Sequence, residues 1–246
     1  NSRHWDRLQH IFSDADAALI LTTEDQLERF REWSVSSSNS DLIPPTVAVE
    51  SIGKRPAERA LPQHCIAAET AVLQYTSGST SSPKGVMVSH RNIGDNMNIL
   101  CDVFGLNRDS VTVSWLPHFH DMGLFEGQLS PIYAGATVYL MSPTAFVQRP
   151  QRWLRALTKY KATHTAAANF AFDLCVERIS ADDRELVDLT HLQTVLNGAE
   201  PIRHSTIERF LQIFGPRGFR ETAMCPGYGL AETTLLGTDS GRDRPP

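Results

Sequence analysis

The chain has 246 residues, of which 41% are hydrophobic and 21% are charged, and its net charge is -5 with a pI near 6.0. This ordinary globular composition allows a sizeable core, and the mild acidity gives no electrostatic reason to expect nucleic acid or an anionic membrane as a partner. No apolar run approaches the roughly 20 residues that span a bilayer. The four cysteines lie far apart, without metal-site spacing. We therefore expect a globular cytoplasmic protein.

Strand-like and helix-like segments alternate along the chain. The residue patterns predict them in this order: helix 7–13, strand 17–21, helix 24–33, strands 46–49 and 71–75, helix 90–104, strands 111–116 and 137–140, helices 150–160 and 171–179, strand 194–196 and helix 204–214. Such alternation predicts an α/β fold with a largely parallel sheet. The polar residues 237–246 are expected to form a surface loop.

The most informative stretch is the loop that follows strand 71–75. It reads Tyr75-Thr76-Ser77-Gly78-Ser79-Thr80-Ser81-Ser82-Pro83-Lys84-Gly85. Backbone N–H groups and hydroxyls of such a loop can surround phosphate oxygens, Lys84 adds a positive charge, and the glycines allow close approach. A Walker A loop has Gly immediately before its Lys, which this loop lacks. The order of strand, small polar loop, Pro-Lys-Gly and helix favours a phosphate-binding loop over a flexible surface loop.

This segment resembles the signature phosphate loop of the adenylate-forming superfamily, which includes acyl-CoA synthetases, luciferases, nonribosomal-peptide adenylation domains and fatty acyl-AMP ligases. The resemblance implies the large N-terminal lobe of that fold, with parallel sheets flanked by helices. Residues 1–246 would then be one domain, truncated at both ends, without the mobile C-terminal domain. Many members have Gly where this chain has Ser81, a change that fatty acyl-AMP ligases tolerate. The match implies contacts to the ATP phosphates from Thr76, Ser77, Gly78, Ser79, Thr80 and the catalytic Lys84.

A second motif, Trp115-Leu116-Pro117-His118-Phe119-His120-Asp121-Met122-Gly123-Leu124, follows a predicted strand. Its two His and one Asp allow a metal site or a His satisfied in a turn, although the ligand set is compressed for a metal. The motif resembles the fatty acyl-AMP ligase version of a segment beside the acyl pocket. That resemblance implies that His120 lines the pocket near the substrate carboxylate as a catalytic residue, and that Asp121 braces the turn.

Two later segments resemble parts of the adenine site. Asn197-Gly198-Ala199-Glu200 follows a short strand, although Asn-Gly is also an ordinary turn. Gly227-Tyr228-Gly229-Leu230-Ala231-Glu232-Thr233-Thr234 resembles the superfamily's Tyr-Gly-x-Thr-Glu element, with Ala231 in place of the usual Thr. Thr233 could supply a substitute hydroxyl. The resemblance implies ATP contacts from Gly198, Ala199, Glu200, Tyr228, Gly229, Ala231 and Thr233.

Within this element, Tyr228 would pack against the adenine face. Glu232 would be a catalytic residue that binds Mg²⁺, because a carboxylate oxygen suits a hard cation bridging ATP phosphates. The alternative interpretation of Glu232 is an acidic residue favoured at a helix N-terminus by the helix dipole.

The stretch 165–173 corresponds to the pocket-lining segment of amino-acid adenylation domains. It reads Thr-Ala-Ala-Ala-Asn-Phe-Ala-Phe-Asp, and its small and aromatic residues suit an apolar chain. Asn169, Phe170 and Phe172 are therefore predicted to bind the substrate. Asp173 keeps an amino-acid substrate open, and the buried face of a helix is the other interpretation.

The resemblance implies ATP- and Mg²⁺-dependent activation of a fatty acid to acyl-AMP, with release of pyrophosphate. The acyl group would pass to the phosphopantetheine of an acyl carrier protein in lipid, polyketide or lipopeptide biosynthesis. The alternatives are an acyl-CoA synthetase and, for this chain by itself, a nucleotide-binding fragment without catalytic activity. The family's ribose-binding Asp, its C-terminal catalytic Lys and the insertion of fatty acyl-AMP ligases would all fall after Pro246.

Overall fold

The computed structural model describes residues 2–36, 43–53, 66–76 and 83–240. By their internal contacts the residues group into two compact units, Asn1–His90 and Arg91–Pro246. The sequence predicted one incomplete domain over the same residues, whereas their contacts separate two units.

The first unit contains two amphipathic helices, α1 (Ser2–Asp14) and α2 (Glu24–Ser36), and a small parallel pair of strands, β1 (Ile20–Thr22) and β2 (Thr46–Ala48). Aromatic side chains of the two helices pack together. The Trp5 ring stacks on Trp33 at a centroid distance of 4.7 Å and meets Phe30 edge-on at 5.9 Å. A short 3-10 turn, η2 (Val49–Ser51), follows β2.

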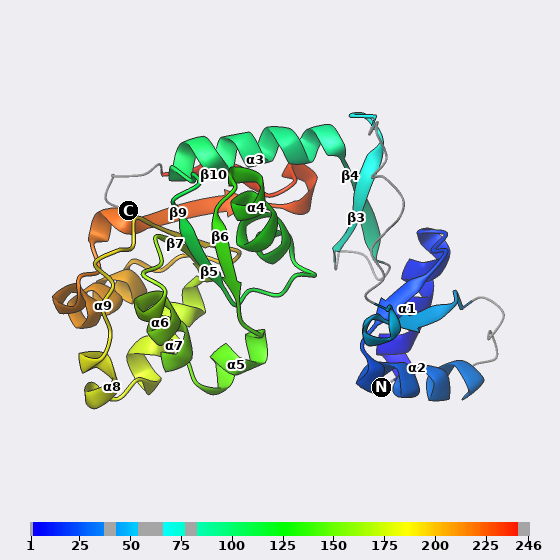
Figure 1. Cartoon of the computed structure of the whole chain (residues 1–246), viewed down its shortest axis with the longest axis horizontal. Helices are drawn as coiled ribbons and strands as arrows, with labels where there is room; N and C mark the ends of the chain where they lie inside the picture. Colours follow the sequence, from blue (N-terminus) through cyan, green and yellow to red (C-terminus); the bar gives the residue numbers. More distant parts are fainter. Residues whose placement is uncertain (1, 37–42, 54–65, 77–82, 241–246) are drawn as a thin grey trace. The chain divides into compact units, whose positions relative to one another are not determined.

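The first unit also contains a hairpin of β3 (Thr70–Thr76) and β4 (Lys84–Ser89), which pair antiparallel (Figure 1). The sequence predicted β3 but placed a helix directly after the loop, and that prediction missed β4. Six residues with Gly85 among them give too short a pattern to be recognised alone, whereas cross-strand pairing with β3 stabilises the strand. Lys84 therefore begins a strand and is not a loop residue.

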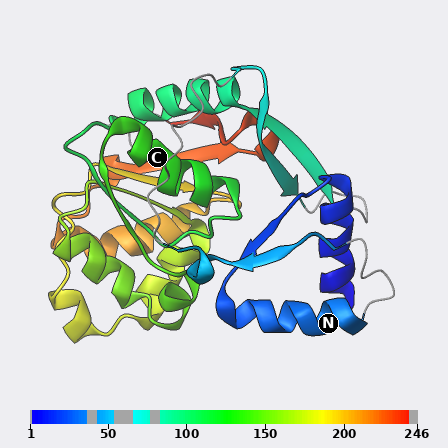
Figure 2. The ribbon, with the colours of Figure 1, turned by 45° about the vertical axis from the view of Figure 1, so that its right-hand side comes forward.

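The second unit is built on a six-stranded sheet with the order β10-β9-β8-β7-β5-β6 (Figures 1 and 2). All neighbouring strands are parallel except β10, which runs antiparallel to β9. This topology confirms the predicted α/β class with a largely parallel sheet. The strands are β5 (Val111–Ser114), β6 (Thr137–Leu140), β7 (His164–Ala168), β8 (Thr194–Gly198), β9 (Met224–Gly229) and β10 (Leu236–Asp239).

Three of these strands were not predicted. β7 is a run of Thr and Ala that lacks the bulky apolar residues of a typical strand, and β9 carries Pro and Gly. The first residues of the predicted C-terminal surface loop instead pair with β9 as part of β10, so the prediction for residues 237–239 was wrong. Pairing with neighbouring strands, and not local propensity, makes these segments β-structure.

Helices cover both faces of the sheet (Figure 2). On one face, the carbonyl of Phe104 in α3 accepts hydrogen bonds from His164 and Thr194. On the other face, the indole N–H of Trp153 in α6 donates to Thr165. The helices are α3 (His90–Phe104), the π-helix η3 (Met122–Leu129), α4 (Ser130–Ala134), α5 (Pro143–Gln148), α6 (Gln151–Lys159), α7 (Asn169–Arg178), α8 (Ala181–Glu185) and α9 (His204–Phe214).

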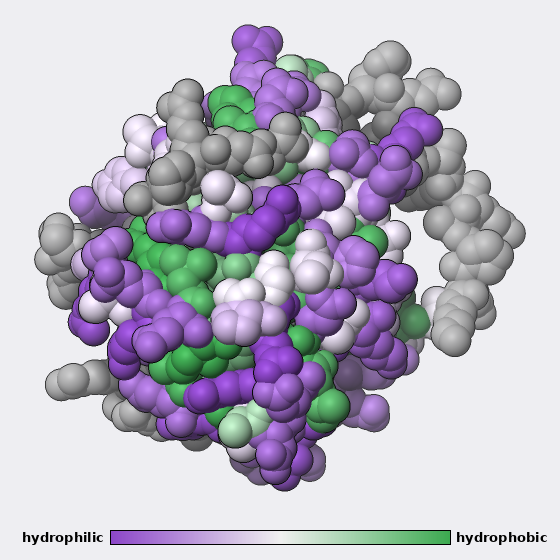
Figure 3. Space-filling view, turned by 90° about the vertical axis from the view of Figure 1, so that its left-hand side faces the viewer, coloured by the Kyte–Doolittle hydropathy of each residue, from purple (hydrophilic) through white to green (hydrophobic). Residues whose placement is uncertain are grey.

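The main hydrophobic core of this unit lies between the sheet and helices α6, α7 and α9, and contains the buried Trp153, Phe172, Phe210 and Phe214. On the face drawn in Figure 3, hydrophilic side chains predominate, with apolar patches between them. Within the described ranges, we find no helix with the length and apolar character that crossing a bilayer requires.

Candidate functional site

The carboxyl ends of β8 and β9 lie side by side in the sheet, where Asn197 pairs in register with Pro226. Beyond this pair the two backbones almost touch, because a Cβ added to Gly198 would lie 2.8 Å from the carbonyl oxygen of Gly227. Ala199 follows with a positive φ of 66°. The fold thus brings together the two segments that the sequence predicted to border adenine. In open α/β sheets, ligands bind at this end of the strands.

A compact loop connects β9 to β10. A Cβ on Gly229 would lie 1.7 Å from the carbonyl oxygen of Leu235, so only glycine fits there. The Thr233 hydroxyl donates to the Leu230 carbonyl at 2.9 Å and accepts from the Leu230 N–H at 3.3 Å. These bonds commit the Thr233 hydroxyl to the loop, and they give no support to the idea that it replaces the missing phosphate-binding Thr. The side chain of Ala231 is buried.

Two side chains, one at the end of β9 and one in the loop that follows it, face solvent. Tyr228 is 65% exposed, and Glu232, in the 3-10 turn η6 (Ala231–Thr233), is also exposed. Glu232 forms no hydrogen bond or ion pair with any other residue that the structure describes. A turn of three residues has little dipole, so the helix-terminus interpretation of Glu232 is weak. Both side chains are free to contact a ligand.

The donor set limits what kind of metal site Glu232 can form. Across the described ranges, no group of three or more His, Cys, Asp or Glu side chains is placed to hold a metal ion. The metal interpretation of the His118–Asp121 motif therefore has no cluster to support it there. A Mg²⁺ ion at Glu232 would need most of its oxygen ligands from ATP phosphates and water, which is how this ion commonly binds. The single free carboxylate fits that role.

In the first unit, Thr76 and Lys84 face each other as the terminal pair of the β3–β4 hairpin. Ser77, Gly78, Ser79 and Thr80 lie outside the described residues. At the next pair, the Tyr75 ring covers Gly85, where a Cβ would lie 3.0 Å from the ring. The Tyr75 hydroxyl donates to the Asp14 carboxylate at 2.6 Å, and burial together with this carboxylate raises the pKa of Tyr75 to about 12. The end of the hairpin that carries Lys84 is thereby tied to α1.

The His120–Asp121 pair begins the π-helix η3. Asp121 accepts a hydrogen bond from the Met122 N–H at 2.6 Å and lies 2.7 Å from Nδ1 of His120. Asp121 therefore braces the turn, as predicted. The hydrogen bond to Asp121 raises the pKa of His120, which favours a proton on Nδ1. A Cβ on Gly123 would lie 2.0 Å from the Pro117 carbonyl oxygen, so the turn also requires this glycine.

A titratable residue that the sequence analysis missed lies in the same π-helix. Glu126 is buried, its Oε2 atom has no hydrogen-bond partner, and burial raises its pKa to about 8. It is therefore largely a neutral carboxylic acid at pH 7. A single carboxylate among the mostly apolar residues Met122–Leu129 was the signal that could have revealed it.

The predicted substrate residues at the start of α7 differ in their surroundings. Phe172 is 0% exposed in the core, where it meets Trp153 at 5.9 Å and Phe210 at 5.1 Å. Phe170 is 44% exposed and contacts the edge of Trp115. The structure corrects the prediction for Phe172, which has no surface open to a ligand because the core surrounds it. Phe170 has such a surface.

Asn169 also has a structural role. It is 3% exposed, its Nδ2 donates to Thr206 Oγ1 at 3.2 Å, and its Oδ1 accepts from the Arg203 N–H. Asp173 belongs to the same network, because it accepts from the Thr206 hydroxyl and pairs with Arg209. Both polar groups are therefore used to hold α7 against α9. Their commitment removes the main support for Asn169 as a substrate ligand and for Asp173 as an ammonium ligand.

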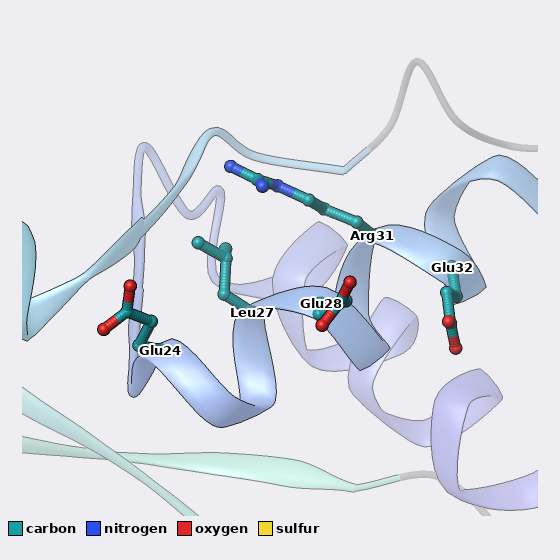
Figure 4. Close-up of a pocket in the computed structure, with 5 residues that line it drawn as sticks. All are labelled: Glu24, Leu27, Glu28, Arg31 and Glu32. Carbon is teal, nitrogen blue, oxygen red and sulfur yellow. The ribbon is translucent and has the colours of Figure 1, made fainter.

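Glu200, predicted to lie beside adenine, caps helix α7. Its Oε1 accepts a hydrogen bond from the Phe170 N–H at 2.6 Å, which satisfies an N–H group of the first helical turn. A different hollow lies on the surface of α2 and is lined by Glu24, Leu27, Glu28, Arg31 and Glu32 (Figure 4). None of these five belongs to the predicted site.

The protein-family comparison decides the assignment. A family described as AMP-binding enzyme matches residues 4–246. The chain belongs to the AMP-binding enzyme family. This membership confirms the resemblance to adenylate-forming enzymes inferred from the motifs.

Curated relatives of this AMP-binding chain include fatty acyl ligases. It is 42% identical to a medium-chain-fatty-acid–[acyl-carrier-protein] ligase, JamA, from Moorena producens, over 94% of this chain and 39% of that protein. It is 38% identical to 4-hydroxyphenylalkanoate adenylyltransferase from Mycobacterium tuberculosis, over 99% of this chain and 40% of that protein. The chain thus spans about two fifths of the length of these relatives.

A solved structure extends the match to three dimensions. The crystal structure of a fatty acid AMP ligase from Legionella pneumophila superposes with a TM-score of 0.90 and 42% identity, over 99% of this chain and 42% of that chain. The AMP-binding chain therefore has the predicted fold of the adenylate-forming N-terminal lobe.

Proposed function

We propose that the protein carrying this chain activates a fatty acid with ATP and Mg²⁺, forming acyl-AMP and pyrophosphate, and passes the acyl group to the phosphopantetheine of an acyl carrier protein. The observation that carries the proposal is the junction of β8 and β9. At this junction the backbone approaches so closely at Gly198 and Gly229 that only glycine fits. The exposed side chains of Tyr228 and Glu232 lie in the same segment as Gly229. The names of JamA and the Legionella ligase support the choice of a fatty acid.

In this reaction a carboxylate oxygen of the fatty acid attacks the α-phosphorus of ATP, and the bond to the pyrophosphate oxygen breaks. Because both reactants are anions, the enzyme mainly positions them and neutralises charge. Tyr228 would stack on adenine, with Gly198, Ala199 and Gly229 giving room for its approach. Lys84, with the loop residues that follow Thr76, would neutralise the departing pyrophosphate.

Two further residues would complete the site. Glu232 would hold Mg²⁺, which neutralises negative charge on the ATP phosphates when it is bound. His120 would lie near the fatty-acid carboxylate, where its raised pKa favours the imidazolium that attracts an anion. Phe170, with its exposed ring face, is the residue of α7 that we propose for contact with the acyl chain.

The deciding experiment supplies the full-length protein with a series of fatty acids of increasing chain length, ATP and Mg²⁺. We expect fatty-acid-dependent pyrophosphate release and acyl-AMP detectable by mass spectrometry. In a second step, CoA and a phosphopantetheinylated carrier protein compete for the acyl group. Efficient acyl-CoA formation would reject the carrier-protein acceptor, and absence of acyl-AMP with every acid would reject the activity itself.

A further inference from the structure

The loop that carries Glu232 is hydrogen-bonded to a buried residue that is distant in the sequence. Asn96, in the interior of helix α3, is buried with 6% exposure. Its Nδ2 group lies 3.2 Å from the Thr233 carbonyl and 3.3 Å from the Leu236 carbonyl, and its Oδ1 accepts from the Leu236 N–H at 3.4 Å. One amide therefore bonds to both ends of the segment Thr233–Leu236.

The segment that Asn96 holds is under backbone constraint. Thr234 has a positive φ of 70° with ψ of -56°, a combination that non-glycine residues rarely adopt. Its side chain is buried, and the neighbouring Gly229 is in close contact with the Leu235 carbonyl. A strained turn persists only where its surroundings hold it in place. The Asn96 amide is one of the groups that do so.

The position of Asn96 on α3 is not explained by helix stability. Asn has a low helix propensity, and a buried polar side chain needs hydrogen-bond partners. Its partners here are all main-chain atoms of the Glu232-bearing loop. The side chain is shielded from solvent and, among the residues that the structure describes, bonds to main-chain atoms alone, so its function in the fold is to shape that loop.

We infer that Asn96 is a positioning residue that fixes the loop 230–236 so that the Glu232 carboxylate meets the Mg²⁺ of bound ATP. This inference rests on the proposed function, because that function gives Glu232 its metal. Asn96 itself touches neither ATP nor Mg²⁺ in this scheme. Without its amide, the turn at Thr234 relaxes and Glu232 samples positions away from the ion.

The test compares Asn96→Asp with Asn98→Asp in the full-length protein. Asp is isosteric with Asn, but at position 96 it replaces the donor with an oxygen that faces two carbonyls. Asn98 is exposed on the same helix, and its Oδ1 accepts a hydrogen bond from the Tyr133 hydroxyl. An Asp carboxylate at position 98 would accept the same hydrogen bond. The control therefore adds the same charge to the same helix and leaves the loop alone.

Two measurements are made. The first is the rate of amide hydrogen exchange of residues 230–236, measured without ATP or Mg²⁺. We expect this rate to be higher in Asn96→Asp than in the unaltered protein, and to be unchanged in Asn98→Asp. The second is the Mg²⁺ concentration for half-maximal pyrophosphate release at saturating ATP. We expect it to rise about 3- to 10-fold in Asn96→Asp, the change that losing one or two hydrogen bonds produces.

The outcomes separate this inference from the proposed function. If Glu232→Gln raises the Mg²⁺ requirement and Asn96→Asp does not, positioning by Asn96 is wrong and the metal role stands. If neither variant changes the requirement while acyl-AMP still forms, the metal role fails and the inference fails with it. Should Asn96→Asp not fold, Asn96→Ala replaces it, since that change removes the amide and its three hydrogen bonds to the loop without adding a charge. Unchanged exchange and an unchanged Mg²⁺ requirement in Asn96→Ala would likewise overturn the inference.

Discussion

The segment that follows β7 and the segment that spans the end of β9 were both predicted from their motifs to contact ligands, yet their side chains have different surroundings in the structure. After β7, Asn169 and Phe172 are buried and bonded or packed against the rest of the unit. At the end of β9 and in the turn after it, Tyr228 and Glu232 face solvent, while the backbone around them is held by Gly229 and the Thr233 hydroxyl. In the segment after β7 the side chains are part of the packed interior, whereas in the segment at the end of β9 they remain exposed.

The difference teaches how to interpret a motif match. A residue whose polar atoms already have buried partners, or whose ring is enclosed by core residues, has little left to offer a ligand. A residue held by its backbone but free at its side chain has its full hydrogen-bonding or stacking capacity available. Stability measurements should therefore respond to the β7 segment, and kinetic measurements to the β9 segment.

The largest expected effect on stability comes from Phe172→Ala. Removing a fully buried phenyl ring leaves a cavity among Trp153 and Phe210 and should lower the free energy of unfolding by about 3–5 kcal/mol. Denaturant-induced unfolding measures this change. Phe170→Ala is the matched control, because its ring is partly exposed, and it should cost clearly less. Equal losses for the two variants would contradict the contrast between core and surface.

Asn169→Ala should have the next largest effect. The substitution leaves the Arg203 N–H without its acceptor and removes a donor to Thr206, so we expect a loss of about 1–3 kcal/mol in the free energy of unfolding. KM for the fatty acid should stay near that of the unaltered protein under conditions where the variant is folded. A large rise in KM with unchanged stability would return Asn169 to the substrate site.

Tyr228→Ala tests the other side of the comparison. Because the ring is exposed, the free energy of unfolding should change by less than about 0.5 kcal/mol. Loss of a ring that stacks on adenine should raise KM for ATP by about 3- to 10-fold, as expected for one aromatic contact. Tyr228→Phe keeps the ring and should retain the ATP affinity. If both variants bind ATP as the unaltered protein does, Tyr228 does not contact adenine.

The smallest effect concerns the pKa of His120. Its hydrogen bond to Asp121 raises this pKa, so Asp121→Asn should lower it toward the ordinary value of about 6.5. The pair stabilises the imidazolium form. Its contribution to folding is therefore present below the ordinary pKa and is lost as pH rises through the raised one. An NMR titration of the His120 imidazole in the unaltered protein and in Asp121→Asn measures the shift. A pKa that stayed raised in Asp121→Asn would show that another group causes the shift.

The helices 90–104 and 204–214 have the predicted bounds, because a helical period over many residues is a local pattern. The short strand 137–140 also has its predicted bounds. β4, β7, β9 and β10 were missed because hydrogen bonds to neighbouring strands stabilise them, and their own residues are short runs rich in small residues, Gly or Pro. The π-helix η3 was missed because its residues have no 3.6-residue apolar period.

The sequence by itself determined the family and the kinds of residue that the site needs. Glycines, small hydroxyl residues, one lysine and one glutamate occur in an order that resembles the motifs of adenylate-forming enzymes, and this order can be recognised in the sequence without a structure. Tertiary structure alone decided which of these side chains remain free. Burial of Phe172, the bonds of Asn169 to Thr206 and Arg203, and the hold of Asn96 on a loop 140 positions later depend on contacts between residues distant in the chain. Periodicity and motif spacing report only on neighbours in sequence, whereas burial and hydrogen-bond partners are set by the packing of the whole unit.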